Sequence, residues 1–556
     1  MSATAPPDPG LAGAREELVR RGYLRERGEP SRPGARTAAW LVVFAALGSL
    51  VVAAGQVSAA RAEPVLVVPL FAGYLPIALA LTGLAAGLGI WAARALLGLG
   101  GQPETVASTL AAAAGLAAAA GVSALLTGSA ARPTELLPGL GSGALFAVAV
   151  AVAVRRALLE RLAYRRGTGD ARRSAWLAPA VVALGAVAAL AWAARPHPEP
   201  SAAAEAYPPP RGRVAVVAVD GLSREELEAA RGVPGGAPLG DVAAWGWAPL
   251  EDLGGRLPAV VWATVACGVE PARHGVVELE EIRLFGAHRG VPLPRLARTL
   301  LLACWRPFGG VEAVARPALA RRAPTFWEMA SRAGCPVTVG GWWGSWPVRR
   351  LLGEVASERA WLAGDASEDA ASPGLAAAVR EAWAPGDGAP AATDRLALAL
   401  AGRSPAQGTH LLALSLPALD LEQRGRAQAP PLLRLAALPS HLEALSAVLA
   451  AVQAKGYEVW LVGVPWHGGT PFVAASTAPP GRQDPTGARV LAATWLDQLG
   501  LPVPSGSPAP RRSLTGVTRD PVAAAGYGPP PPPVAAPPPE ALATQREVLR
   551  SLGYLQ

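Results

Sequence analysis

The chain has 556 residues, of which 51% are apolar, and it contains in addition 62 Gly and 56 Pro. This length is too great for one domain, and the composition is too apolar for a purely soluble protein. The formal net charge of +8 comes from arginines scattered along the chain, so it does not indicate a nucleic-acid site. Three cysteines, Cys267, Cys304 and Cys335, exclude a full disulfide framework and allow one disulfide at most.

Five stretches near the N-terminus are apolar and long enough to cross a bilayer as helices, which takes about 20 residues each. They lie near 38–58, 68–93, 105–128, 138–154 and 175–194. The second stretch contains Pro69 and Pro76, so a re-entrant piece is an alternative there. No stretch carries a charge in its middle, which disfavours a transporter. The sequence predicts a cytoplasmic tail at 1–37 and then an α-helical membrane bundle of about five spans over 38–194.

Arginines in the loops predict the orientation of these spans. The N-terminal tail and the loop at 155–173 are rich in Arg, whereas the loops after the first and third spans carry one each, Arg61 and Arg132. The positive-inside rule therefore places the tail and the 155–173 loop in the cytoplasm. A long charged segment precedes the first span, so this span is not expected to be a cleaved signal peptide. Five spans then give a multi-pass membrane protein whose C-terminal domain is extracytoplasmic.

A Pro-rich stalk at 195–212 leads into a segment, 213–515, with the pattern of an α/β domain. Short apolar runs alternate there with helical patterns, which predicts a mainly parallel central sheet. The runs begin near 213, 335, 410 and 457, and the helical patterns include 324–334 and 441–456. Ligands bind outside the carboxyl ends of such strands. Asp220, Asp420 and His467 lie at those ends and are therefore candidate site residues.

Several motifs of this segment resemble, in order, those of the alkaline phosphatase superfamily, in the branch of type I phosphodiesterases and nucleotide pyrophosphatases. They are VAVVAVDGL at 214–222, LPAVVWATVACGVEPARHGV at 257–276, PTFWEMASRAGCPVTVGGWWGSWPV at 324–348, LALSLPALDLEQR at 412–424, VWLVGVPWHGG at 459–469 and VLAATWLDQLGLPVPSG at 490–506. The terminal LRSLGYL at 549–555 is similar to the ending of bacterial relatives. The resemblance implies an alkaline-phosphatase-like fold over roughly 213–515.

The resemblance also implies a two-metal site. The family holds two divalent cations, usually zinc, with Asp and His ligands and a Ser or Thr nucleophile that the metals activate. Carried over to this chain, Asp220 matches the first metal-binding Asp, and Asp420 matches the Asp of an Asp-x-x-x-His pair. The nucleophile position falls on Pro258, or on Ala259 if the register slips by one. Neither residue has a hydroxyl group.

Most other ligand positions of the family are replaced. Arg424 stands where the His after Asp420 is expected, and Trp466 stands for the Asp of the Asp-His pair that His467 completes. In a second register His467 is the family's last His, and both members of the Asp-His pair are missing. At most three of the seven positions survive in either register. The vestigial metal residues are then Asp220, Asp420 and His467, with no catalytic residue and no cofactor expected.

Several of these residues also have a structural interpretation. Asp220 is a candidate cap for the helix that follows it, and Asp420 is expected to form an ion pair with Arg424 in an emptied metal site. His274, in the Pro-x-x-His-Gly motif, is expected to serve as a structural hydrogen-bonding residue. Thr264, the hydroxyl nearest to the nucleophile position, is expected to face helix packing. An aromatic patch is expected to pack in the same way; it comprises Trp342, Trp343 and Trp346.

The sequence predicts a membrane-anchored protein whose ectodomain is a non-catalytic binding or assembly module of the cell envelope. The expected partners are the lipid bilayer and an envelope protein, lipid or glycan, and no nucleic acid. The alternative is a divergent phosphohydrolase or phosphotransferase with relocated ligands for zinc or another divalent cation. A Pro-rich linker at 516–540 and an amphipathic helix at 541–556 complete the chain.

Overall fold

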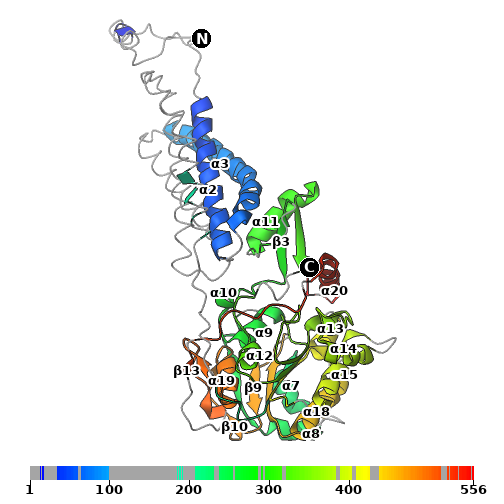
Figure 1. Cartoon of the computed structure of the whole chain (residues 1–556). Helices are drawn as coiled ribbons and strands as arrows, with labels where there is room; N and C mark the ends of the chain where they lie inside the picture. Colours follow the sequence, from blue (N-terminus) through cyan, green and yellow to red (C-terminus); the bar gives the residue numbers. More distant parts are fainter. Residues whose placement is uncertain are drawn as a thin grey trace. The chain divides into compact units, whose positions relative to one another are not determined.

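The computed structural model describes about two thirds of the chain, in two compact units (Figure 1). The described residues are 13, 16–17, 34–59, 64–98, 184–185, 187–188, 191, 194, 207–230, 237–254, 257–285, 290–291, 293, 295–315, 321–383, 388–403, 408–425, 438–466, 468–514, 523–524, 526–535, 537–552 and 554–555. The first unit joins 1–197 with 282–313, and the second joins 198–281 with 314–556. Residues 282–313, which the sequence predicts to be part of the α/β segment, thus group with the first unit.

The second unit is built on a nine-stranded sheet in the order β10-β2-β9-β8-β1-β7-β5-β6, with β11 paired to β2. Strands β8, β1, β7, β5 and β6 run parallel, and β9 is antiparallel to both of its neighbours. The strands are β1 Val214–Asp220, β2 Gly246–Glu251, β5 Val337–Gly340, β6 Gly353–Ala356, β7 Leu411–Leu416, β8 Glu458–Val464, β9 Phe472–Ala475, β10 Gly481–Arg482 and β11 Thr486–Gly487. This architecture confirms the predicted α/β domain with a mainly parallel sheet.

Helices cover both faces of this sheet because its central strands are apolar on both sides. All seven residues of β1 are buried. Val216 faces a core that includes α9, α12 and α19, whereas Val217 faces a core that includes α8, α14, α15 and α18. These helices are α8 Ala237–Ala243, α9 Pro258–Cys267, α12 Phe326–Arg332, α14 Pro373–Ala382, α15 Ala389–Gly402, α18 Leu438–Gln453 and α19 Val490–Gln498. Successive side chains of a strand point to opposite faces of the sheet, so β1 contributes side chains to both cores.

The first unit contains two long apolar helices, α2 Gly34–Ala59 and α3 Val67–Gly98. They contain the first two predicted spans. Helix α3 continues through Pro76, so the structure does not have the re-entrant piece considered for this segment. The third and fourth predicted spans lie outside the described residues, and the fifth is described at six positions only.

Among the described residues, one stretch, Pro64–Leu84, is long and apolar enough to cross a membrane. Ala45–Ser58 is apolar but shorter. A single stretch of this kind is also what a signal sequence or a buried core helix presents. The five-span bundle is therefore not supported by the described residues and stays a proposal.

The C-terminal residues 526–555, named here the C-terminal strap, cross the second unit and pair with it. Val534 N–H donates to the carbonyl of Val348 over 2.8 Å, and the carbonyl of Pro532 accepts from Arg350 N–H. The strap ends in helix α20, Pro539–Ser551, and in the buried Tyr554. Proline carbonyls remain available as acceptors although proline has no N–H. The proline-rich segment therefore lies against the domain.

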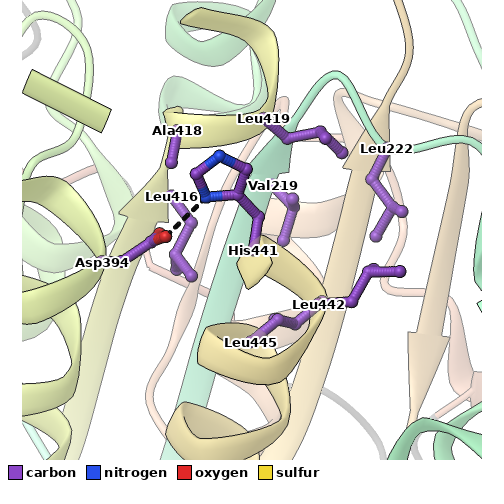
Figure 2. A pocket seen from close by; sticks show the side chains of 9 residues that line it. All are labelled: Val219, Leu222, Asp394, Leu416, Ala418, Leu419, His441, Leu442 and Leu445. Carbon is purple, nitrogen blue, oxygen red and sulfur yellow. Dashed lines mark hydrogen bonds and ion pairs between the residues drawn. The ribbon is translucent and has the colours of Figure 1, made fainter. Parts of the chain in front are cut away.

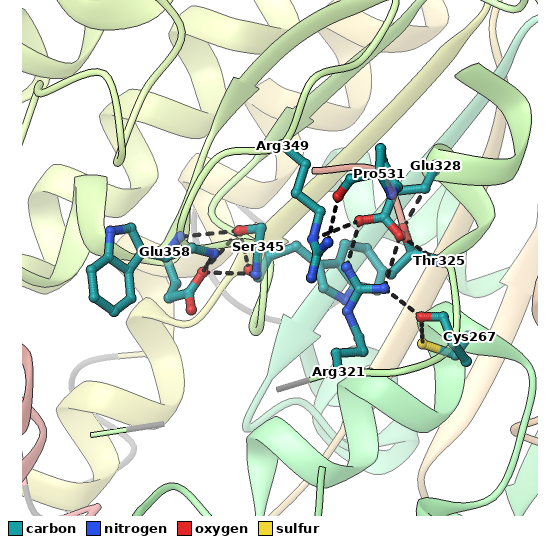
Figure 3. A network of polar contacts seen from close by, with 11 residues as sticks. Cys267, Arg321, Thr325, Glu328, Ser345, Arg349, Glu358 and Pro531 are labelled. Carbon is teal, nitrogen blue, oxygen red and sulfur yellow. Dashed lines mark hydrogen bonds and ion pairs between the residues drawn. The ribbon is translucent and has the colours of Figure 1, made fainter. Parts of the chain in front are cut away.

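A buried ionic network contacts the strap at Pro531 (Figure 3). Arg321 donates twice to the carboxylate of Glu328, and Arg349 lies 3.4 Å from the same carboxylate. Arg349 also donates to the carbonyl of Pro531. Burial alone would raise the pKa of Glu328, but the two guanidinium groups lower it below its ordinary value. Glu328 therefore stays ionised and links α12 to the strap.

Candidate functional site

The predicted site lies where three adjacent parallel strands end. Asp220 is the last residue of β1 and is in register with Val464, the last residue of β8. Strand β7 ends at Leu416, and Asp420 follows in the first turn of helix α16, Ala418–Gly425. The structure therefore brings the two predicted aspartates to one end of the sheet, as the sequence predicts. His467, the third predicted residue, lies outside the described residues.

Three tryptophan side chains from three separate elements donate to the buried carboxylate of Asp220. The indole N–H of Trp262, in α9, and that of Trp466, after β8, both reach Oδ1, the latter over 3.2 Å. The indole N–H of Trp343, after β5, reaches Oδ2 over 2.9 Å. Indole is a hydrogen-bond donor only. Both oxygens of Asp220 are thus directed at protein donors, and none of these donors is a metal ligand.

The second aspartate is bound by the C-terminal strap. Tyr554 donates its phenolic O–H to Oδ2 of Asp420 over 2.7 Å, and both residues are buried. The Tyr554 ring also meets the ring of Trp343 edge to face, with centroids 5.0 Å apart. One aromatic pair therefore connects the two carboxylates. The side chain of Arg424 lies outside the described part of the chain, so its predicted ion pair with Asp420 stays a prediction.

The two carboxylates share a buried, low-dielectric site. Burial and the charge of Asp420 raise the pKa of Asp220 from its ordinary value of 3.8 to about 7, although the three indole N–H groups lower it. Burial therefore favours the protonated form of Asp220. The local helix does not use it as a cap. Ser223 caps helix α7, Arg224–Ala229, through a capping box with Glu226, so the alternative role of Asp220 as a cap is wrong.

Helix α9 begins where the family's nucleophile would stand. Pro258 is its first residue, and Leu257 occupies the cap position without a side-chain hydrogen bond. Trp262 lies one turn further on, so it shares the helix face of Pro258. The Trp262 indole on this face of α9 reaches Asp220, and the face carries no hydroxyl group. Ala259 is buried in the same first turn.

The nearest hydroxyl and the motif histidine form a structural pair. Val276 N–H donates to Nδ1 of His274 over 3.1 Å, so the ring proton is assigned to Nε2, which faces Thr264 Oγ1 at 3.1 Å. Thr264 in turn donates to the carbonyl of Val260 within its own helix. All of these polar atoms have partners inside the turn. The structural roles predicted for His274 and Thr264 are therefore confirmed, and so is the packing of the Trp342 region, which is buried.

These residues do not fit two divalent cations. Among the residues that the structure describes, no group of three His, Cys, Asp or Glu side chains could hold a metal ion. Within the described part of the chain, three indole N–H groups donate to Asp220 and the phenol of Tyr554 donates to Asp420. An indole that faces a carboxylate takes the place a cation would need. No metal-dependent step can be derived from this arrangement.

A second polar pair lies on the opposite face of the sheet (Figure 2). His441, in α18, places Nδ1 2.7 Å from Oδ2 of Asp394, in α15. Burial raises the pKa of Asp394, against the effect of its hydrogen bond to His441. The other residues that line this pocket are Val219, Leu222, Leu416, Ala418, Leu419, Leu442 and Leu445. All of these other lining residues are apolar, so we interpret the pair as a contact that joins two helices.

Sequence reasoning missed the two features that define the site. Trp466 was interpreted only as a lost ligand, and Trp262 only as part of a turn motif. The terminal Tyr554 was noted as part of an ending common to bacterial relatives, and this motif was the available signal. Nothing in the local sequence shows that these side chains converge.

No protein-family model matches the chain, and no curated protein matches it. Solved structures are similar to parts of it. One is phosphonoacetate hydrolase from Sinorhizobium meliloti 1021 in complex with phosphonoformate, at 18% identity over 46% of this chain and 57% of that one, with a TM-score of 0.31. Another is murine ectonucleotide pyrophosphatase/phosphodiesterase 5, at 12% identity over 45% and 56%, with a TM-score of 0.30.

A third is a phosphonate monoester hydrolase from Silicibacter pomeroyi, at 13% identity over 56% of this chain and 78% of that one, with a TM-score of 0.32. All three belong to the alkaline phosphatase superfamily, which is the superfamily that the motifs resemble. The chain spans little more than half the length of the first two. At these identities and TM-scores, the likeness carries no argument about activity.

Proposed function

We propose that this chain is a membrane-anchored protein whose extracytoplasmic, alkaline-phosphatase-like domain is non-catalytic and serves in binding or assembly at the cell envelope. One observation carries the proposal. The carboxylate of Asp220, which the resemblance makes a metal ligand, accepts instead from three indole N–H groups of the protein. The motif order supports the family fold, and Pro258 at the nucleophile position supports the loss of chemistry.

The closed state of the site supports a role other than turnover. Tyr554 is 7% exposed and Trp343 is 3% exposed, and both cover the carboxylates. A substrate phosphoryl group would have to displace these aromatic side chains and would then meet two buried carboxylates. Repulsion between like charges in a buried site makes that binding unfavourable. The proposed partners, an envelope protein, lipid or glycan beside the bilayer, therefore bind elsewhere on the domain.

The test is a phosphoesterase assay on the full chain in detergent. Aryl phosphomonoesters and phosphodiesters are offered with zinc, manganese or magnesium, and the expected rate is the background rate. Asp220→Ala tests the site, and Asp394→Ala, in the polar pair on the other face, serves as its control. Metal-dependent turnover that Asp220→Ala abolishes and Asp394→Ala retains would overturn the proposal in favour of a divergent phosphohydrolase.

A further inference from the structure

The segment 282–313, named here the insert, leaves the α/β chain and packs on the apolar helices of the first unit. Helix α11, Arg295–Trp305, and strand β4, Val311–Ala315, contribute to a core with α2 and α3. Trp305 donates its indole N–H to the carbonyl of Gly73 over 3.0 Å. A side chain at Gly73 would press on Leu301 at 3.2 Å, so the glycine permits the close approach. The insert is thus fixed to the early turns of α3.

The insert also exposes a cluster of aromatic rings around Trp305. Phe285 and Phe308 both meet the ring of Trp305 edge to face, with centroids 5.3 and 6.4 Å away. Phe308 is 79% exposed and Phe285 is 45% exposed. Arg306 lies beside them and is exposed. Aromatic rings with a neighbouring arginine are typical of the membrane–water interface, where headgroup phosphates accept from the guanidinium.

The length of α3 places this cluster relative to a bilayer. The helix has 32 residues, or about 48 Å, whereas a hydrocarbon core is about 30 Å thick. One side of its first turns, with Val67, Leu70 and Tyr74, is buried in the core that α2 and the insert share. Further on, an apolar stripe is exposed, comprising Leu81, Leu84, Leu88 and Trp91. The later part of the helix therefore presents a continuous apolar stripe suited to lipid, whereas at its start Val68 is the exposed apolar side chain.

Trp91 marks the other end of that surface. It is 70% exposed, and it lies eighteen residues after Gly73, which corresponds to about 27 Å of helix. This distance matches a hydrocarbon core of about 30 Å. The aromatic cluster of the insert and Trp91 thus lie one bilayer thickness apart along α3. Aromatic residues at both boundaries are the arrangement that membrane helices prefer.

We propose that the insert is a membrane-interface element whose aromatic cluster, Phe285, Trp305 and Phe308, lies in the headgroup–acyl boundary on the extracytoplasmic side. The part of α3 that crosses the hydrocarbon then runs from about Gly73 to Trp91. The occupant of the exposed rings is lipid because Trp305, at the centre of the cluster, is fixed to α3 at Gly73, and the exposed apolar stripe of the same helix begins at Leu81. This inference rests on the proposed membrane anchor.

The test uses the full chain in nanodiscs of phosphatidylcholine and phosphatidylglycerol, with an environment-sensitive fluorophore on single cysteines. Cys304→Ser removes the partly exposed native thiol, and Cys267 and Cys335 are buried. Phe308→Cys reports on the insert, and Leu84→Cys reports on the anchor. Asp484→Cys, at a side chain that is 93% exposed in the second unit, is the aqueous control.

Lipids brominated high or low on the acyl chain then locate each label. We expect the label at 308 to lose emission mainly to bromines near the headgroup, the label at 84 to bromines deeper in the chain, and the label at 484 to neither. If 84 is quenched while 308 behaves like 484, the interface role is wrong and the anchor stands. If 308 is shielded from water without bromine quenching, a protein or a second copy covers it, which also refutes the proposal. If 84 is not quenched, the anchor itself is wrong.

Discussion

Replacing Tyr554 with Phe removes one hydroxyl group from the site and leaves the ring in place. The lost contact is the 2.7 Å hydrogen bond to Asp420, between two buried side chains. A hydrogen bond to a charged group contributes about 1.5–3 kcal/mol, and a buried carboxylate that loses this bond does not gain water in its place. We expect the free energy needed to open the strap to fall by about 2 kcal/mol. Tyr527→Phe is the matched control, because Tyr527 donates over the same 2.7 Å to a neutral carbonyl, that of Pro502.

Limited trypsin digestion of the full chain measures this opening, because Arg546 and Arg550 lie in α20 of the strap. When opening is fast relative to cleavage, the cleavage rate follows the open population. A change of 2 kcal/mol corresponds to about 30-fold faster release of the C-terminal peptide. The control should give about 5-fold, for a neutral bond of about 1 kcal/mol. If the C-terminal peptide is released from Tyr554→Phe no faster than from Tyr527→Phe, the closure of the site by Tyr554 is refuted.

Three further predictions concern the same end of the sheet. The raised pKa of Asp220 means that the folded state holds the proton more tightly than the unfolded state, so the free energy of unfolding should fall by up to about 4 kcal/mol as pH rises from about 4 to about 7. Urea titrations should show a weaker dependence of this free energy on pH in Asp220→Asn, and an equal dependence would contradict the prediction. Trp343→Phe removes an indole donor from Asp220, so it should raise the pKa of that carboxyl further and move the pH dependence of stability to higher pH. The control is Trp361→Phe, because the Trp361 indole donates to a neutral carbonyl over 2.8 Å; this variant should lower the stability of the protein without moving its pH dependence. His274→Ala should cost roughly 2 kcal/mol of stability, because the N–H of a buried turn loses its acceptor; an unchanged urea midpoint would show that the turn does not need the ring.

The sheet and the place of the two aspartates could be predicted from the sequence. The apolar runs that end at Asp220 and precede Asp420 are buried on both faces, and such runs indicate parallel strands. Parallel strands bring their carboxyl ends to one edge, so the two carboxylates had to lie near each other. The capping alternative for Asp220 failed because Ser223 supplies a better cap three residues later.

The partners of the aspartates could not be predicted in the same way. Trp262, Trp343 and Trp466 lie in three elements spread over about 200 residues, and their convergence depends on the order of the strands. Tyr554 reaches Asp420 only after the strap has crossed the domain. No local periodicity encodes either contact, and a buried indole in a sequence looks like core packing. The grouping of the insert with the first unit depends likewise on contacts between distant residues, such as that of Trp305 with Gly73.

The central claim is that hydrogen-bond donors of the protein, and no metal ions, bind the carboxylates at the end of the sheet. Zinc and manganese content of the purified full chain tests it most directly, measured by mass spectrometry after equilibration with each metal and removal of the free ions. Asp220→Ala is compared with Asp252→Ala, at a carboxylate that is 68% exposed on the surface. The account predicts no stoichiometric metal in the wild-type chain and no difference between the two variants. Two ions per chain that Asp220→Ala loses and Asp252→Ala retains would contradict it.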